Sequence, residues 1–194
     1  VVWTATAGVT RLLRPEMAGG GPVALSADGR KLAYAIGGAL SRSVPLRIIE
    51  LGDVSGSEVD VPPLPQGSGA VLSAAFARDG KTLAAGTQNG FVQIWQIGDK
   101  PRPFRLLEHS VVPSPGSYEV VEHVFVGPDS RSLVSRFGGA WQVWDIPTST
   151  PLGSPQVTTS PIAAFAATRQ TLLTINQQTV VAHDYSVTHL RAVA

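Results

Sequence analysis

The chain has 194 residues, of which 43% are hydrophobic and 15% are charged, and this composition excludes a disordered tail. Its 15 basic and 14 acidic side chains nearly cancel and form no long block, so we expect no nucleic-acid partner. There is no cysteine, which excludes a disulfide framework, and no apolar run near the roughly 20 residues that span a bilayer, so we expect no membrane association.

Glycine and proline are frequent along the whole chain, with 20 and 15 residues respectively. They interrupt every helical pattern of apolar residues, so we expect an all-β chain with many turns. The chain begins with Val1-Val2-Trp3 and has its single methionine at Met17. This start is neither an initiator Met nor a signal peptide, and we expect the natural beginning of the polypeptide to lie elsewhere.

Two sequence markers recur at intervals of about 40 to 50 residues. The first joins an apolar strand end to a turn and a leucine, and its clearest copy is Phe76-Ala77-Arg78-Asp79-Gly80-Lys81-Thr82-Leu83. The second is an apolar strand such as Phe91-Val92-Gln93-Ile94-Trp95. The leucines of the first marker are Leu32, Leu83, Leu133 and Leu172, and the aligned positions of the second are Trp3, Ile49, Trp95, Trp144 and His183. Two independent markers with one period predict an internal repeat.

The repeat predicts the elements in chain order. Residues 1–15 hold a third strand that ends at Trp3 and a fourth strand near Val9 to Arg14. Four complete four-stranded units follow, at approximately 22–62, 71–108, 120–157 and 161–193, and Val187 to Val193 supplies the last strand.

Each strand of a unit has its own character. The first is nearly all apolar, as in Ser73-Ala74-Ala75-Phe76, and we expect it to be buried on both faces. An Asp-Gly turn leads to a second strand of small residues, and the third strand alternates, so that Val92 and Gln93 point to different faces. The fourth carries proline, as at Pro101 and Pro103, which suits an outer edge. This order of strands is that of a β-propeller blade.

These residues resemble the WD-repeat β-propeller family over essentially the whole chain. The resemblance is carried by the two markers of the second unit and by Trp141-Gln142-Val143-Trp144-Asp145, which contains the Trp-Asp dipeptide that names the family. Glu108-His109 is similar to the Gly-His element that opens a repeat in that family. The resemblance also implies a buried tetrad of His, Asp, Ser or Thr, and Trp, which is not complete in any unit of this chain. We therefore expect packing to carry most of the blade stability.

The resemblance further implies a ring of seven or eight blades. We thus expect four complete blades plus the outer two strands of a fifth, as a fragment of a larger ring whose remaining blades lie on another chain or segment. We also expect Trp95 and Trp144 at equivalent buried positions between neighbouring blades.

We expect no catalytic, cofactor or metal site. His183, Asp184 and His189 are of metal-ligand types, but His183 falls on a marker position, which favours a structural role. Gly19-Gly20-Gly21 is followed by Pro22 and a strand, whereas a phosphate cradle needs the N-terminus of a helix. No nucleophile elbow and no acid-base cluster is present.

Candidate partner-binding residues lie in or beside two long loops, 37–45 and 110–119, or equivalent connections, which strand alternation places on one face of the disc. They are Arg42, Tyr118, Arg136 and Phe137, because aromatic and arginine side chains often anchor protein interfaces. An equally good interpretation is that these loops merely tolerate insertion.

Lys100, Arg102 and Arg105 form the densest basic group. They offer a docking site for an acidic partner, but a solvated outer strand protected by charge is the favoured interpretation.

The preferred function is a non-catalytic protein-interaction or sensing scaffold within a larger signalling or regulatory protein of the cytoplasm. Arginine outnumbers lysine, which hints at a bacterial source. The alternative is a propeller that gates or shapes the active site of a peptidase- or kinase-linked enzyme encoded elsewhere in the parent chain, since fold alone does not decide function.

Overall fold

In the computed structural model, antiparallel sheets and the turns that join them make up the chain. The structure describes residues 2–3, 10–11, 21–35, 46–51, 58–109, 120–157, 162–165, 171–176 and 179–184. These residues contain no helix, and hence none long and apolar enough to cross a membrane. The prediction of an all-β chain is confirmed.

Three sheets have four strands each, and strands that follow one another in the chain are neighbours in the sheet. Blade 1 consists of β3 (Val23–Leu25), β4 (Lys31–Ala35), β5 (Leu46–Glu50) and β6 (Glu58–Asp60). Blade 2 consists of β7 (Val71–Phe76), β8 (Thr82–Thr87), β9 (Phe91–Gln96) and β10 (Arg102–Glu108). Blade 3 consists of β11 (Val121–Val126), β12 (Ser132–Phe137), β13 (Ala140–Asp145) and β14 (Thr150–Val157).

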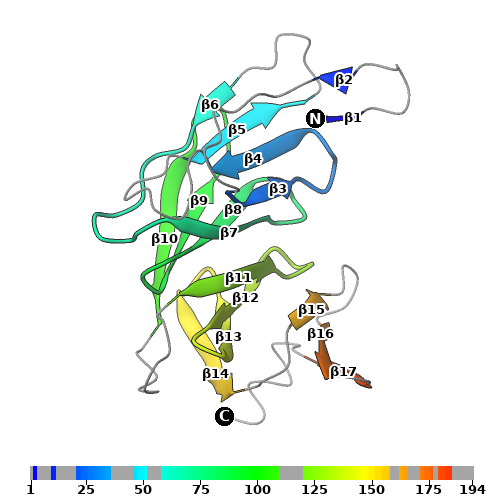
Figure 1. Cartoon of the computed structure of the whole chain (residues 1–194). Helices are drawn as coiled ribbons and strands as arrows, with labels where there is room; N and C mark the ends of the chain where they lie inside the picture. The colour runs from blue at the N-terminus through cyan, green and yellow to red at the C-terminus, as the bar shows by residue number, and fades with distance from the viewer. Residues whose placement is uncertain are drawn as a thin grey trace.

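Two smaller sheets complete the described strands. β1 (Val2–Trp3) pairs with β2 (Thr10–Arg11), where a third and a fourth strand were expected. Blade 4 has β15 (Ile162–Phe165), β16 (Thr171–Asn176) and β17 (Thr179–Asp184), and its expected last strand at 187–193 lies outside the described residues. Figure 1 shows blades 1 to 4 succeeding one another in chain order, and the inner strands β3, β7 and β11 are in contact. The architecture is a partial β-propeller.

The two sequence markers are directly paired across the second and third strands of each blade. Leu32 lies opposite Ile49, Leu83 opposite Trp95 and Leu133 opposite Trp144. Leu172 lies opposite His183 in the same way. The repeat in the sequence is therefore a repeat of cross-strand pairs.

The Asp-Gly and Asp-Ser pairs make one kind of turn between the first two strands. The carboxylate oxygen of Asp28, Asp79 and Asp129 accepts a hydrogen bond from the backbone N–H two residues later, at 3.0, 2.8 and 3.0 Å. The glycine directly after the aspartate has a positive φ, +70° at Gly29 and +64° at Gly80. Glycine is favoured there because a left-handed backbone strains other L-residues.

The joints between blades are apolar and centre on tryptophan. Trp95 is completely buried and packs in a cluster with Leu46 and Ile48 of blade 1, and its indole N–H donates to the carbonyl of Pro62 at 3.1 Å. Trp144 is buried in the next cluster, together with Val92 and Ile94 of blade 2. The predicted burial of both tryptophans between blades is confirmed.

The small residues of β8 allow blades 2 and 3 to approach closely. A Cβ atom at Gly86 would lie 2.5 Å from a methyl carbon of Val121 and 2.6 Å from the hydroxyl of Ser73. No side chain larger than hydrogen fits there without movement of β11, which explains why the second strand carries glycine.

The prediction that the first strand is buried on both faces is wrong. Val23 and Leu25 of β3 are exposed, as are Glu122 and His123 of β11. The most buried strands are the second and third, because they lie inside the sheet. The first strand is an edge of the sheet and has a neighbouring strand on one side only. β8 and β13 lie inside their sheets and are buried over almost their whole length.

The basic group of the outer strand makes contacts within the chain. Arg105 donates from Nε and Nη2 to the carbonyl of Pro147, at 3.2 and 2.9 Å, and its guanidinium lies over the ring of Phe104. Arg102 binds the side-chain oxygen of Gln96 at 3.0 and 2.5 Å. Arg105 thus ties the outer strand of blade 2 to blade 3.

Candidate functional site at the joint of blades 2 and 3

His109 follows β10 directly and places its ring between blades 2 and 3. Its Nδ1 lies 2.9 Å from the carbonyl oxygen of Gly90 in blade 2, and its Nε2 lies 2.7 Å from the hydroxyl of Ser135 in blade 3. The indole N–H of Trp144 donates to the same hydroxyl at 2.8 Å. One buried imidazole therefore links both blades to the joint tryptophan.

The directions of these bonds follow from the groups involved. A carbonyl only accepts and an indole N–H only donates, so Nδ1 carries the proton and donates to Gly90. The Ser135 hydroxyl accepts from Trp144 and donates to Nε2, which must be unprotonated. Burial lowers the pKa of His109, while the bond to Gly90 acts in the opposite direction. The network is thus complete with a neutral imidazole.

Two ring contacts fix the orientation of His109. Phe137 at the end of β12 stacks on the imidazole, with ring centroids 4.6 Å apart and planes 17° apart. Trp144 meets the imidazole edge-on at 5.1 Å and 84°. Such pairs add stabilisation beyond the area that they bury. The three rings form a rigid wall at the joint.

The outer strand of blade 3 bulges away from β13 beside this wall. Val143 pairs with Leu152 and Trp141 with Gln156, so that Gly153, Ser154 and Pro155 lie opposite the single residue Gln142. The buried Gln142 amide donates to the carbonyls of Val143 and Gly153, at 2.8 and 3.1 Å. The side chain thus satisfies backbone groups that the bulge removes from the ladder.

Gln93 has the same place in blade 2. Its amide donates to the carbonyls of Ile94 and Arg105, at 2.9 and 2.7 Å, beside a register shift of β10 between Pro103 and Arg105. Blades 2 and 3 therefore share the buried glutamine, and the copy in blade 3 lies beside a pocket.

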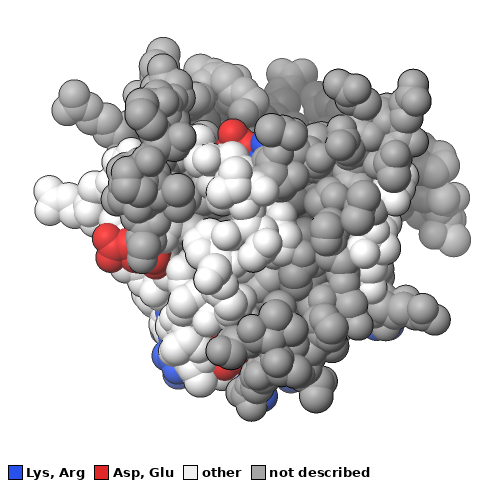
Figure 2. Space-filling model, turned by 90° about the horizontal axis from the view of Figure 1, so that it is seen from below, with Lys and Arg blue, Asp and Glu red and all other residues white. Residues whose placement is uncertain are grey.

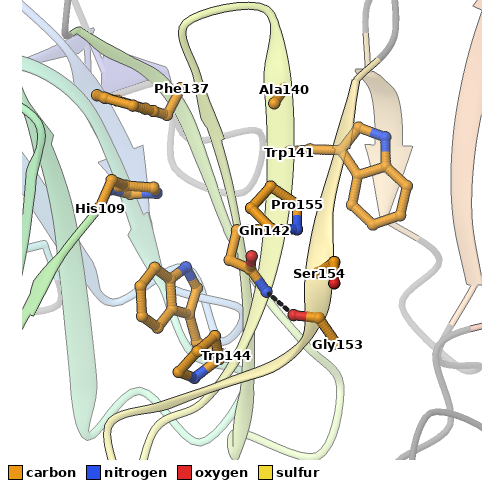
Figure 3. A pocket seen from close by; sticks show the side chains of 10 residues that line it. His109, Phe137, Ala140, Trp141, Gln142, Trp144, Gly153, Ser154 and Pro155 are labelled. Carbon is orange, nitrogen blue, oxygen red and sulfur yellow. Dashed lines mark hydrogen bonds between the residues drawn. The ribbon is translucent and has the colours of Figure 1, made fainter. Parts of the chain in front are cut away.

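The wall and the bulge enclose a pocket of about 270 Å³ (Figure 3). Its lining is aromatic rings, prolines and small or amide-bearing residues, without a charged side chain: His109, Phe137, Ala140, Trp141, Gln142, Trp144, Pro151, Gly153, Ser154 and Pro155. In Figure 3, His109 and Phe137 stand on one side of β13, and Trp141 stands on the other. The pocket can hold an uncharged group in contact with ring faces.

The four candidate residues from the sequence have different outcomes. Arg42 and Tyr118 lie outside the described residues. Phe137 ends strand β12 and lines the pocket, although it is buried rather than displayed on a loop. Arg136, next to it on β12, is mostly buried and forms an ion pair with Glu122 at 3.3 Å.

Sequence reasoning missed most of the pocket. Glu108-His109 was the available signal for His109, but Ser135 carried no marker of its own. The alternation expected along the third strands gave no sign that Gln142 is buried, and the bulge of β14 has no signal beyond Pro151 and Pro155. Within the described residues, His109, Ser135 and Trp144 of the tetrad types come together, and no carboxylate joins them.

The described part of the chain contains no group of three His, Cys, Asp or Glu residues placed to hold a metal ion. His183 lies on β17, while His189 is outside the described residues.

Comparison with known proteins supports the fold. No family profile and no curated protein matches the sequence. A chain in a crystal structure of the mitotic checkpoint complex is similar, with a TM-score of 0.59 and 16% identity. The match covers 86% of this chain and 49% of that chain, so this chain spans about half the length of its match. At this identity the likeness concerns the fold alone, and it supports the partial β-propeller.

Proposed function

We propose that this chain is a non-catalytic protein-interaction or sensing scaffold, the propeller part of a larger signalling or regulatory protein of the cytoplasm. The pocket at the joint of blades 2 and 3 is the observation that carries the proposal. Its walls are ring faces and its lining has no charged side chain, so a charged ligand would lose its hydration without a partner. An apolar or aromatic side chain of a partner protein suits it better.

The size of the pocket supports the same choice. About 270 Å³ is just below the usual range for small-molecule sites, and it suits one large side chain or a short turn of peptide. The walls are held by the His109 network and by the Gln142 bonds before any ligand arrives. Binding then requires little ordering of the protein, which favours affinity.

The charge distribution fits a protein partner as well. The described part of the face in Figure 2 is mostly uncharged and carries only scattered acidic and basic side chains. A nucleic-acid binder would instead present a basic stripe. Arg42, Tyr118 and Arg136 are proposed to contact the same partner, and Phe137 forms part of the pocket wall.

A displayed peptide library tests this proposal. We expect peptides with an aromatic or proline residue to be enriched on the folded chain. Ser154→Glu adds a carboxylate at an exposed position that lines the pocket, and we expect at least about tenfold weaker binding, equal to about 1.4 kcal/mol. Val157→Glu adds the same charge on the same strand outside the lining and should leave binding unchanged.

Two results would reject the proposal. One is the absence of any enriched peptide on a chain that is shown to be folded. The other is an equal effect of Ser154→Glu and Val157→Glu, because the pocket would then play no part in binding.

We also propose that the protein partners include the remaining blades of the same propeller, on another chain or segment.

A further inference from the structure

The inner strand β3 of blade 1 is buried on one face and exposed on the other. Val23 and Leu25 of β3 are 56% and 57% exposed, whereas Ala24 between them is buried against blade 2. Val23 pairs with Tyr34, and Leu25 with Leu32, so these four residues share a face of the sheet. The open face is therefore apolar.

The exposed area is confined to the inner part of that face. Tyr34 is buried, and so is Ile49, which pairs with Leu32 and belongs to the same face. Exposed apolar side chains in a contiguous group commonly mark an interaction site. On this face the side chains of β3 are therefore exposed, whereas Tyr34 of β4 and Ile49 of β5 are buried.

The repeat shows how the same positions are used in the next two blades. By cross-strand register, Val23 and Leu25 correspond to Ala74 and Phe76 in blade 2, and to Val124 and Val126 in blade 3. Ala74 and Phe76 pack on the cluster that contains blade 1 residues. Val124 and Val126 pack in the cluster that contains blade 2 residues. In both joints these positions contact the preceding blade.

We infer that Val23 and Leu25 form a docking surface for the first two strands of a further propeller blade. The surface continues the inter-blade interface that the described residues build between blades 1 and 2 and between blades 2 and 3. The inference rests on the proposed partnership with remaining blades and specifies where they bind and what they present.

The chemistry of the known joints describes the docking strands. The face on which blade 2 packs presents Ala33 and Ala35 of β4, and the face on which blade 3 packs presents Ala84 of β8. Gly86 has no room for a Cβ atom against Val121. The partner should therefore carry alanine or glycine at alternate positions of a second strand, after an Asp-Gly hairpin like that of residues 76–83.

Photo-crosslinking tests the inference. Benzoylphenylalanine is placed at Val23 of the full chain in its natural assembly, and at Val157 as the control, since Val157 is 79% exposed on the outer strand of blade 3. We expect Val23 to crosslink to a small-residue strand of a blade outside these 194 residues, and Val157 not to crosslink to that strand. A crosslink to β15–β17 of a second copy, to a segment that is not a blade strand, or to nothing would overturn the inference.

A second variant guards against an unreactive probe. Leu25→Lys buries a charge in the proposed interface and should reduce the amount of the further blade retained by at least about tenfold, whereas Val157→Lys should not. Equal retention in both variants would contradict the docking surface. Neither variant touches the pocket of blade 3, so failure here is distinguishable from failure of peptide binding at Ser154.

Discussion

A residue without a side chain allows two blades to approach each other closely. Gly86 faces Val121 across the joint of blades 2 and 3, with no room for a Cβ atom. We expect Gly86→Ala to lower the free energy of unfolding by about 1–3 kcal/mol, because β11 must shift and the joint is overpacked. Urea unfolding of the folded protein measures this change. Gly98→Ala is the matched control, since no atom lies within 4 Å of its added Cβ; an equal loss in both variants would contradict the close approach.

His109 makes the joint sensitive to acid. Burial lowers the pKa of His109 in the folded state, so the unfolded chain binds the proton more readily. Above the ordinary histidine pKa of about 6.5, the ring is neutral in both the folded and the unfolded state, and its burial carries no protonation penalty. Below that pH the unfolded chain takes up the proton, so the free energy of unfolding falls. The protonated Nε2 would also point a donor at Ser135, which can no longer donate to it.

Unfolding measured at neutral and mildly acidic pH checks this account. We expect a loss of stability in acid that is smaller in His109→Gln, which cannot titrate. If the two proteins lose the same amount between the two pH values, His109 is not the group responsible.

At this scale the sequence predicted the tryptophans better than the polar residues. The burial of Trp95 and Trp144 can be predicted from the marker alone, because a large apolar side chain at a repeated position is expected to lie in the core. The burial of Ser135 and Gln142 cannot, since it depends on hydrogen bonds to other strands, from Trp144 to Ser135 and from Gln142 to the carbonyl of Gly153. Phe137 was singled out as a candidate partner-binding residue beside a loop, and the structure stacks it on His109.

At the scale of elements, the outer strand with its bulge is the least regular part of a blade. Gln142 replaces the missing ladder bonds through its amide N–H groups. We expect Gln142→Glu to destabilise the protein by about 1–3 kcal/mol, because a carboxylate oxygen would face the carbonyls of Val143 and Gly153. Thermal unfolding measures this effect. Gln156→Glu, an exposed change on β14, is the control, and equal destabilisation would argue against the bridging role.

Strand order was predictable, but strand burial was not. Hairpin turns at Asp28, Asp79 and Asp129 fix where the first two strands meet, and local backbone chemistry is enough to predict them. Burial of β3 depends on whether a neighbouring sheet covers it, which no local pattern encodes. Val23 and Leu25 have apolar side chains suited to burial, yet both are exposed.

At the scale of the whole molecule, the blades hold together through their joints. Trp95 is fully buried between blades 1 and 2 and binds Pro62 of the first. We expect Trp95→Ala to cost about 3–5 kcal/mol in the free energy of unfolding, as for other large core truncations. Chemical denaturation of the assembled propeller measures it, and a loss below about 1 kcal/mol would mean that the joint is not a packed core.

The pocket at the joint of blades 2 and 3 is the proposed binding site, and the indole N–H signals of an NMR spectrum test this proposal most directly. The chain has four tryptophans, of which Trp141 and Trp144 line the pocket while Trp95 is sealed in another joint. On addition of a peptide selected from the library, we predict shifts of the Trp141 and Trp144 signals and an unchanged Trp95 signal. Binding that leaves the Trp141 and Trp144 signals in place would contradict the assignment of the pocket as the interaction site.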